Sequence, residues 1–210
     1  FWLCCCAWCV ARRWTVGLRI VTRPLADALC AVLLLAALVQ GAGAAIIQAK
    51  AWLAPVLIER AWRASLAAGG APVKPWPWAD TWPVARLQAP EQGADLLVLA
   101  GDTGNALAFG PGHALASAPL GSQGLAVIGG HRDTHFAFLQ SLAPGAALRL
   151  QLVSGEWRHY RVRAAEVVDA TRERLSSAAQ EETLMLVTCY PFDTLAVGGP
   201  LRLVVSAAPG

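Results

Sequence analysis

The sequence has few charged residues and no concentrated charge of either sign. Charged side chains make up 15% of the 210 residues, hydrophobic ones make up 56%, and the formal net charge at pH 7 is +3. A nucleic-acid-binding protein needs a clustered basic surface, so this composition argues against nucleic acid as a partner. The apolar excess over an ordinary soluble domain points instead to a membrane segment.

One stretch carries no charge at all. Residues 28–47 are uncharged, and Gln40 is the only strongly polar residue among them. As a helix they would span about 30 Å, the thickness of the hydrocarbon core of a bilayer. The arginines at positions 12, 13, 19 and 23 precede this stretch and predict a cytoplasmic N-terminus with the rest of the chain outside. A cleavable signal peptide is the alternative, with Ala42-Gly43-Ala44 as a loosely fitting cleavage site.

Cysteine is scarce in the part of the chain that would be exported. Cys189 is the only cysteine after Cys30, and the cluster at positions 4, 5, 6 and 9 has no metal-site spacing. Exported proteins usually pair their cysteines, but Cys189 has no partner there. A thiol of this kind is either a buried hydrophobic side chain or a reactive group.

The remaining chain is predicted to be mainly β. Leu148–Leu152 alternates apolar and polar residues, and Ser154-Gly155 predicts a turn into a second strand at 157–163. Short apolar runs between turn residues favour a barrel or sandwich. These runs are 96–100, 106–109, 125–128, 147–153, 160–164, 184–188 and 201–205. The predicted segments are 1–24 (cytoplasmic), 25–47 (anchor), 48–94 (a helix, then a Pro- and Trp-rich linker) and 95–210 (catalytic domain).

Three residues stand where chemistry is expected. Cys189 follows the apolar run 184–188, where a strand would hold it and a loop would expose it. His131 follows another run and two glycines, and a cysteine nucleophile needs an imidazole nearby. Arg202 lies inside an apolar run, where it either points to solvent or donates to an oxyanion.

Two other motifs include His131. His131-Arg132-Asp133 copies the protein-kinase catalytic tripeptide, but Phe138 replaces the expected asparagine and no glycine-rich phosphate loop is present. His131 and His135 have the spacing of zinc ligands without the glutamate of the zinc-protease motif, and Asp133 could add a ligand. A metal-dependent hydrolase therefore stays open as an alternative.

Together the three candidate residues resemble the sortase pattern. Gly130-His131 matches the family's histidine after a strand and a glycine, and Leu186–Cys189 matches its nucleophile strand. Arg202 matches the arginine on the next strand, and the resemblance covers about residues 95–207. Four longer strings look like class GN sortases of Gram-negative proteobacteria: 76–80, 131–136, 188–192 and 198–202.

The resemblance implies an eight-stranded sortase β-barrel with short helices, preceded by one N-terminal transmembrane helix. It implies a cysteine transpeptidase that cuts a sorting signal near the C-terminus of a secreted protein. Cys189 would be the nucleophile, His131 the general acid and base, and Arg202 the oxyanion donor. The predicted substrate contacts are made by Thr188, Tyr190 and Asp133.

The resemblance also implies partners and a location. The partners are the secreted target protein, an amine acceptor of unknown identity and the membrane, with no cofactor and no metal. In a Gram-negative cell the anchor would cross the inner membrane once, and the catalytic domain would lie in the periplasm.

Two further interpretations compete with this one. An L,D-transpeptidase also uses Cys, His and Arg on a β scaffold, but that family expects Ser-x-Gly before its cysteine, where this chain has Leu186-Val187-Thr188. A non-catalytic membrane-tethered β-domain would hold Cys189 as an inert buried side chain.

Overall fold

The structure is a computed structural model that describes residues 5–172, 181–194 and 199–210. Residues 1–4 of the predicted cytoplasmic segment and residue 198 of the last motif lie outside the described residues. The chain divides into two units, one up to Trp52 and one from Leu53 to Gly210. The helices and strands are α1 (Cys5–Ala67), β1 (Pro83–Ala89), η1 (Pro90–Gln92), β2 (Ala94–Ala100), α2 (Gly104–Leu107), β3 (Gly112–His113), β4 (Leu125–Gly129), η2 (Ala137–Ser141), β5 (Ala147–Leu152), β6 (Trp157–Asp169), β7 (Thr183–Cys189) and β8 (Leu201–Pro209).

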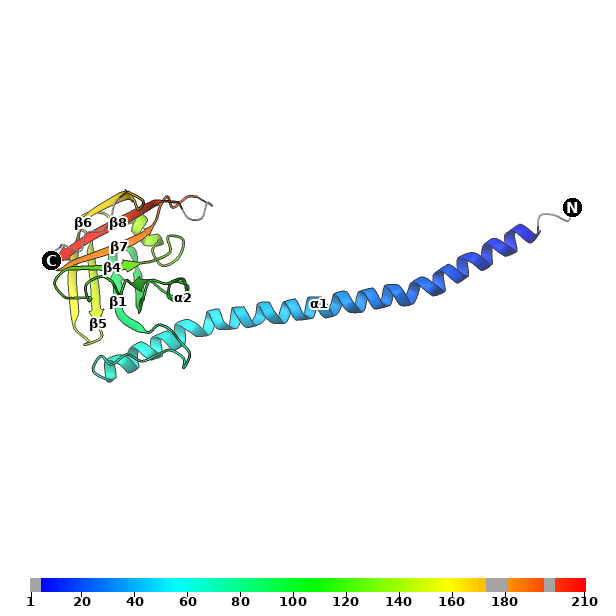
Figure 1. The fold of residues 1–210 in the computed structure, drawn as a ribbon, viewed down its shortest axis with the longest axis horizontal. Coiled ribbons are helices and arrows are strands. Elements are labelled where there is room, and N and C mark those ends of the chain that lie inside the picture. The colour runs from blue at the N-terminus through cyan, green and yellow to red at the C-terminus, as the bar shows by residue number, and fades with distance from the viewer. Residues whose placement is uncertain (1–4, 173–180, 195–198) are drawn as a thin grey trace. The chain divides into compact units, whose positions relative to one another are not determined.

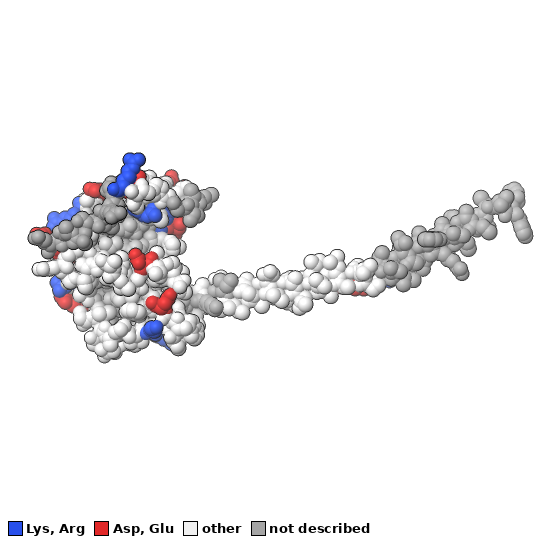
Figure 2. Space-filling view, viewed as in Figure 1, with Lys and Arg blue, Asp and Glu red and all other residues white. Residues whose placement is uncertain are grey.

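The first unit consists of the greater part of α1, with its apolar side chains facing outward. Between Leu25 and Ile46 the large apolar side chains are 56–70% exposed. Within Arg23–Ala67, an 18-residue window has a mean hydropathy of 2.3, which makes this part of α1 a candidate membrane span by length and composition. Figure 2 shows the described part of this helix as a surface almost without charged side chains. Its length and composition fit the predicted anchor at 25–47, although a signal sequence would have the same character.

The second unit begins with the last turns of α1. Ala54, Ile58, Trp62 and Ser65 are all buried, and they recur at the spacing that places side chains on one face of a helix. Ile58 belongs to a small apolar cluster with Leu99 of β2. The end of α1 is therefore packed against the barrel as part of the same unit.

The eight strands close into a barrel in the order β1-β2-β3-β4-β7-β8-β6-β5 (Figure 1). β4 and β7 pair in parallel, while β7 and β8 pair antiparallel, so β7 lies between β4 and β8. The interior is filled by buried apolar side chains such as Leu87, Ile128, Leu148 and Leu186. This confirms the mainly β barrel that the resemblance implied.

The predicted hairpin is present. β5 and β6 are antiparallel neighbours, and Leu148 and Leu150 are buried while Arg149 is exposed, as the alternation predicted. Gly155 has φ +88°, a left-handed conformation that favours glycine in the turn.

The structure differs from the sequence analysis in three details. Residues 106–109 do not form a strand, because 104–107 form the one-turn helix α2. β1 lies inside the segment 48–94 that was predicted to be a linker, so the barrel begins before residue 95. The two-residue strand β3 was also not foreseen, since Gly112–His113 is too short to show periodicity.

Candidate active site

Cys189 is the last residue of β7. Along this strand Leu184, Leu186 and Thr188 are buried, whereas Cys189 lies on the alternate, partly exposed side. The strand therefore fixes the backbone of the cysteine while the thiol remains partly accessible. This is the position that the apolar run before Cys189 predicted.

Arg202 lies directly across from Cys189. The two residues are register partners in the antiparallel pair of β7 and β8. Opposite residues of such a pair place their side chains on the same face of the sheet, with Cβ atoms about 5 Å apart. The Arg202 Nη1 atom donates to the carbonyls of Gly199 (2.6 Å) and Leu201 (2.8 Å), which fixes the guanidinium at this edge.

His131 reaches the same edge from the other neighbour of β7. In the parallel pair of β4 and β7, Gly129 aligns with Val187, and His131 and Cys189 each follow this aligned pair by two residues. The Gly130 N–H donates to the Val187 carbonyl (3.1 Å), and the Thr188 hydroxyl donates to the Gly130 carbonyl (2.7 Å). The described structure therefore sets Cys189 opposite Arg202 and holds the loop that carries His131 against β7 at the same edge of the sheet.

A close packing contact explains the second glycine before His131. A Cβ atom at Gly130 would lie 2.8 Å from the ring of the fully buried Phe136. The Phe136 N–H in turn donates to the His131 carbonyl (2.9 Å), so the chain folds back tightly over residues 131–136. Gly129 differs, because nothing lies within 4 Å of a Cβ added there.

The sortase domain family matches residues 87–210, which is more than half of the chain. The chain belongs to the sortase family. Members of this family are cysteine transpeptidases, and the cysteine, histidine and arginine described above lie within the matched residues.

One curated relative is sortase D from Bacillus subtilis (strain 168), which is 33% identical over 120 residues. The match covers 57% of this chain and 60% of the length of the relative. Among solved structures, a sortase D5 transpeptidase of Clostridium perfringens has 22% identity and a TM-score of 0.54, covering 61% of this chain and 79% of its own. Sortase A of Corynebacterium diphtheriae has 24% identity and a TM-score of 0.56, and the match covers 75% of this chain and 84% of that structure. At these identities the two solved structures show the fold.

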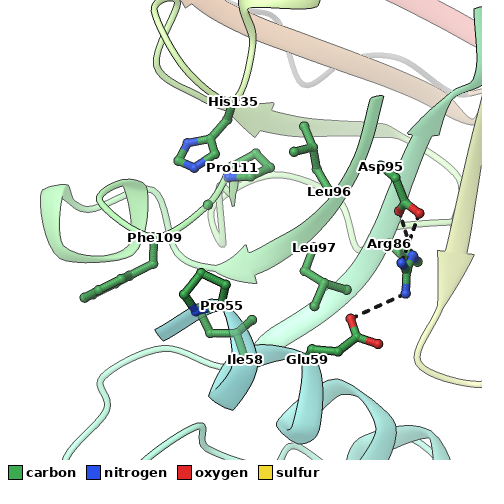
Figure 3. Close-up of a pocket in the computed structure, with 11 residues that line it drawn as sticks. Pro55, Ile58, Glu59, Arg86, Asp95, Leu96, Leu97, Phe109, Pro111 and His135 are labelled. Carbon is green, nitrogen blue, oxygen red and sulfur yellow. Dashed lines mark hydrogen bonds and ion pairs between the residues drawn. The ribbon is translucent and has the colours of Figure 1, made fainter. Parts of the chain in front are cut away.

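His135, four residues after His131, lines a pocket that does not include the predicted catalytic residues. Burial lowers the pKa of His135, and the nearby charge of His131 lowers it further. Figure 3 shows His135 at a pocket of about 190 Å³ between the end of α1, β1 and β2. On the opposite wall Arg86 bridges the carboxylates of Glu59 and Asp95. None of Cys189, His131 and Arg202 lines this pocket, so it is distinct from the candidate active site.

The predicted substrate contacts of the sortase have different surroundings. Thr188 is buried, and its hydroxyl is engaged with Gly130 inside the protein. Tyr190 is half-buried, with its ring edge-on to Phe192. Asp133 is exposed and forms an ion pair with Arg132 (3.2 Å). Their role in substrate binding stays a prediction, and for Thr188 the observed contact is one that joins β7 to the loop after β4.

Arg132 was missed as a functional residue by the sequence analysis. Its side chain is buried, and its guanidinium donates to the carbonyls of Pro191 (2.8 Å) and Thr194 (2.9 Å) in the loop after Cys189. In the sequence, Arg132 is recognisable only as a charged residue directly after His131. It entered the sequence analysis as part of the kinase-like tripeptide and of the string 131–136.

The metal alternative can be examined over residues 5–172, 181–194 and 199–210. Within these ranges no three His, Cys, Asp or Glu side chains are grouped as a metal site would group them. His131 and His135 are near one another, but Asp133 points its carboxylate to Arg132.

Proposed function

We propose that this sortase is a membrane-anchored cysteine transpeptidase that cleaves a C-terminal sorting signal of a secreted protein. The proposal is supported by the register that sets Cys189 opposite Arg202 and by the pairing of β4 with β7, which brings the loop of His131 to the same edge. This arrangement offers a nucleophile, a proton carrier and an oxyanion donor at one accessible edge of the barrel.

In the proposed first step, His131 takes the proton of the Cys189 thiol, and the sulfur attacks the scissile carbonyl of the sorting signal. The carbonyl oxygen gains negative charge, which the guanidinium of Arg202 stabilises. The C–N bond then breaks, His131 gives a proton to the leaving amine, and a thioester to Cys189 remains.

In the second step, an amine acceptor attacks the thioester. His131 takes the proton from the attacking amine, the new amide bond forms as the C–S bond breaks, and His131 returns the proton to the sulfur of Cys189. Thr188, Tyr190 and Asp133 are proposed to contact the sorting signal, because they lie beside the catalytic residues in the sequence and in the two loops. The chemistry uses no cofactor and no metal.

We also propose that this chain is a class GN sortase of a Gram-negative cell. The strings at 131–136 and 188–192 and the Pro- and Trp-rich stretch after α1 support this assignment. The apolar helix then anchors the protein in the inner membrane, with the N-terminus inside and the barrel in the periplasm.

The test of catalysis uses the full chain in detergent micelles, with Cys189→Ala beside it and Cys30→Ala as the matched control. Each is incubated with a library of sorting-signal peptides, and intact masses are recorded. We expect a thioester adduct on the wild type and on Cys30→Ala, released by hydroxylamine, and none on Cys189→Ala. If no peptide forms an adduct and Cys189 also resists thiol reagents in the folded protein, the non-catalytic β-domain is the better description.

The test of topology fuses a reporter that is active only outside the cytoplasm to the C-terminus. A Gram-negative host that expresses the fusion should show reporter activity in the membrane fraction. Activity in the soluble periplasmic fraction would indicate a cleaved signal instead of an anchor, and no activity would overturn the proposed orientation.

A further inference from the structure

Arg132 is an unusual residue to bury, because a charged guanidinium loses its hydration in a protein interior. The side chain of Arg132 is only 9% exposed. Each end of its planar head has a partner, with Nε donating to the Asp133 carboxylate and Nη1 and Nη2 donating to the carbonyls of Pro191 and Thr194. Charge-assisted hydrogen bonds of this geometry offset the loss of water and hold their acceptors in place.

The acceptors belong to the loop that carries the proposed nucleophile. Pro191 and Thr194 follow Cys189 by two and five residues, and Arg132 directly follows His131. Arg132 therefore joins the loop after β4 to the loop after β7. Its contacts lie beyond His131 and Cys189 along the two chains, and we call this the far side of the pair; β4 and β7 lie on the near side.

The near side of the pair is joined as well. There the Gly130 N–H donates to the Val187 carbonyl, and the Thr188 hydroxyl donates to the Gly130 carbonyl. His131 is thus flanked by cross-links at residues 130 and 132, and Cys189 by cross-links before and after it. Among the described residues, the Arg132 contacts tie the loop after β7 directly to the loop that carries His131, in addition to the contacts on the near side.

We propose that Arg132 is a positioning residue that sets the geometry of His131 and Cys189 by holding the loop after β7 against the loop after β4. The inference rests on the proposed function, because it assigns Arg132 a role in the chemistry of that pair. Arg132 acts through the backbone of the two loops, not by contact with the reacting atoms.

The planar head of arginine is what the role requires. Two carbonyls at different positions in the loop are reached by two separate N–H groups of one rigid fork. A lysine would keep the positive charge, but it carries a single nitrogen on a flexible stem and cannot reproduce this bridge. Arg132→Lys therefore separates the charge of the residue from its geometry.

The experiment compares full-length wild type, Arg132→Lys and Arg132→Gln in detergent micelles. Arg161→Lys is the matched control, since Nη1 of Arg161 also donates to a loop carbonyl, that of Gly145 (2.9 Å), on β6 away from the predicted catalytic residues. The measurements are kcat and KM for peptide transfer, the rate of Cys189 alkylation by iodoacetamide, and the thermal midpoint.

We expect Arg132→Lys to lower kcat by about 10- to 100-fold, because a small misplacement of reacting groups has an effect of that order. KM should change by less than about threefold, and Arg132→Gln should resemble Arg132→Lys. Arg161→Lys should stay within about twofold of wild type in every measurement. A kcat for Arg132→Lys within about twofold of wild type, or a loss that matches the unfolded fraction, would overturn the proposal.

The alkylation rate separates this inference from the proposed function. If wild type transfers no peptide, the proposed function fails, and His131→Ala then shows whether the imidazole affects the thiol. An alkylation rate of Arg132→Lys that moves from the wild-type value toward that of His131→Ala supports the positioning role. The positioning role is overturned if Cys189 is alkylated at the same rate in Arg132→Lys as in wild type. This holds whatever the alkylation rate of His131→Ala.

Discussion

Two connections of the same barrel are held in different ways. The turn between β5 and β6 is closed by hydrogen bonds among its own residues, from Gly155 N–H to the Leu152 carbonyl (2.8 Å), from Leu152 N–H to the Glu156 carbonyl (2.9 Å) and from Glu156 N–H to the Ser154 hydroxyl (3.4 Å). All of these hydrogen-bond partners lie within four residues of one another, so the bonds that close the turn are local.

The loops after β4 and β7 depend on side chains instead. The hydroxyl of Thr188 and the guanidinium of Arg132 reach carbonyls 58 to 62 residues away. Parallel strands cannot be joined by a tight turn, so the ends of β4 and β7 have to be connected across space. The comparison indicates that substitutions at the β4–β7 edge should affect catalysis, whereas those at the β5–β6 turn should affect stability only.

The largest effect should come from Arg202→Ala at the β7–β8 part of this edge. Loss of an oxyanion donor lowers kcat by about 10²- to 10³-fold, and the free energy of unfolding should change little because Arg202 is only half-buried. Steady-state kinetics and chemical denaturation measure the two. Arg149→Ala, an exposed arginine on β5, serves as the control. Equal kcat values for the two variants would remove Arg202 from the proposed mechanism.

Gly130→Ala should have an intermediate effect on both properties. The added methyl group would press on the ring of Phe136, and overpacking of this kind lowers the free energy of unfolding by about 1–3 kcal/mol. Because Phe136 closes the turn that carries His131, kcat should also fall by about tenfold.

Gly129→Ala is the matched control for this substitution, since the space around a Cβ atom at Gly129 is open. Thermal unfolding and peptide-transfer kinetics are measured for Gly130→Ala and Gly129→Ala. Identical behaviour of the two alanine variants would mean that the contact with Phe136 does not position His131.

The smallest effect should come from Gly155→Ala in the β5–β6 turn. Its φ of +88° is unfavourable for a residue with a side chain, so the free energy of unfolding should fall by about 1 kcal/mol. Transfer activity should stay within about twofold of wild type. Gly104→Ala, at an open site without a positive φ, should lose no stability. A large loss of activity in Gly155→Ala would contradict the separation between the two connections.

The same contrast explains which elements could be predicted from the sequence. The β5–β6 hairpin and the end of β7 at Cys189 are visible as local patterns, and both are confirmed. Residues 106–109 have the composition of a short strand, yet α2 forms there, because a four-residue apolar run carries no usable period. β1 was hidden by the prolines around it, although its residues alternate buried and half-buried.

The candidate catalytic residues were chosen from their side-chain chemistry and their sequence neighbours, because the sequence does not show which residues touch one another. A cysteine after an apolar run, a histidine after glycines and an arginine among apolar residues are each recognisable alone. Arg132 has no comparable signal, because its importance depends on which carbonyls lie within reach of its side chain.

The sequence by itself determined the apolar helix, the mainly β character, the hairpin and the residue types that a sortase needs, because these depend on composition and on order over a few residues. Only the tertiary structure decided that β7 lies between β4 and β8, that Cys189 is the register partner of Arg202, and that Arg132 joins the loops after β4 and β7. The physical reason is chain closure. Contacts between residues 58 or more positions apart form only when the whole barrel closes, and no local pattern records them.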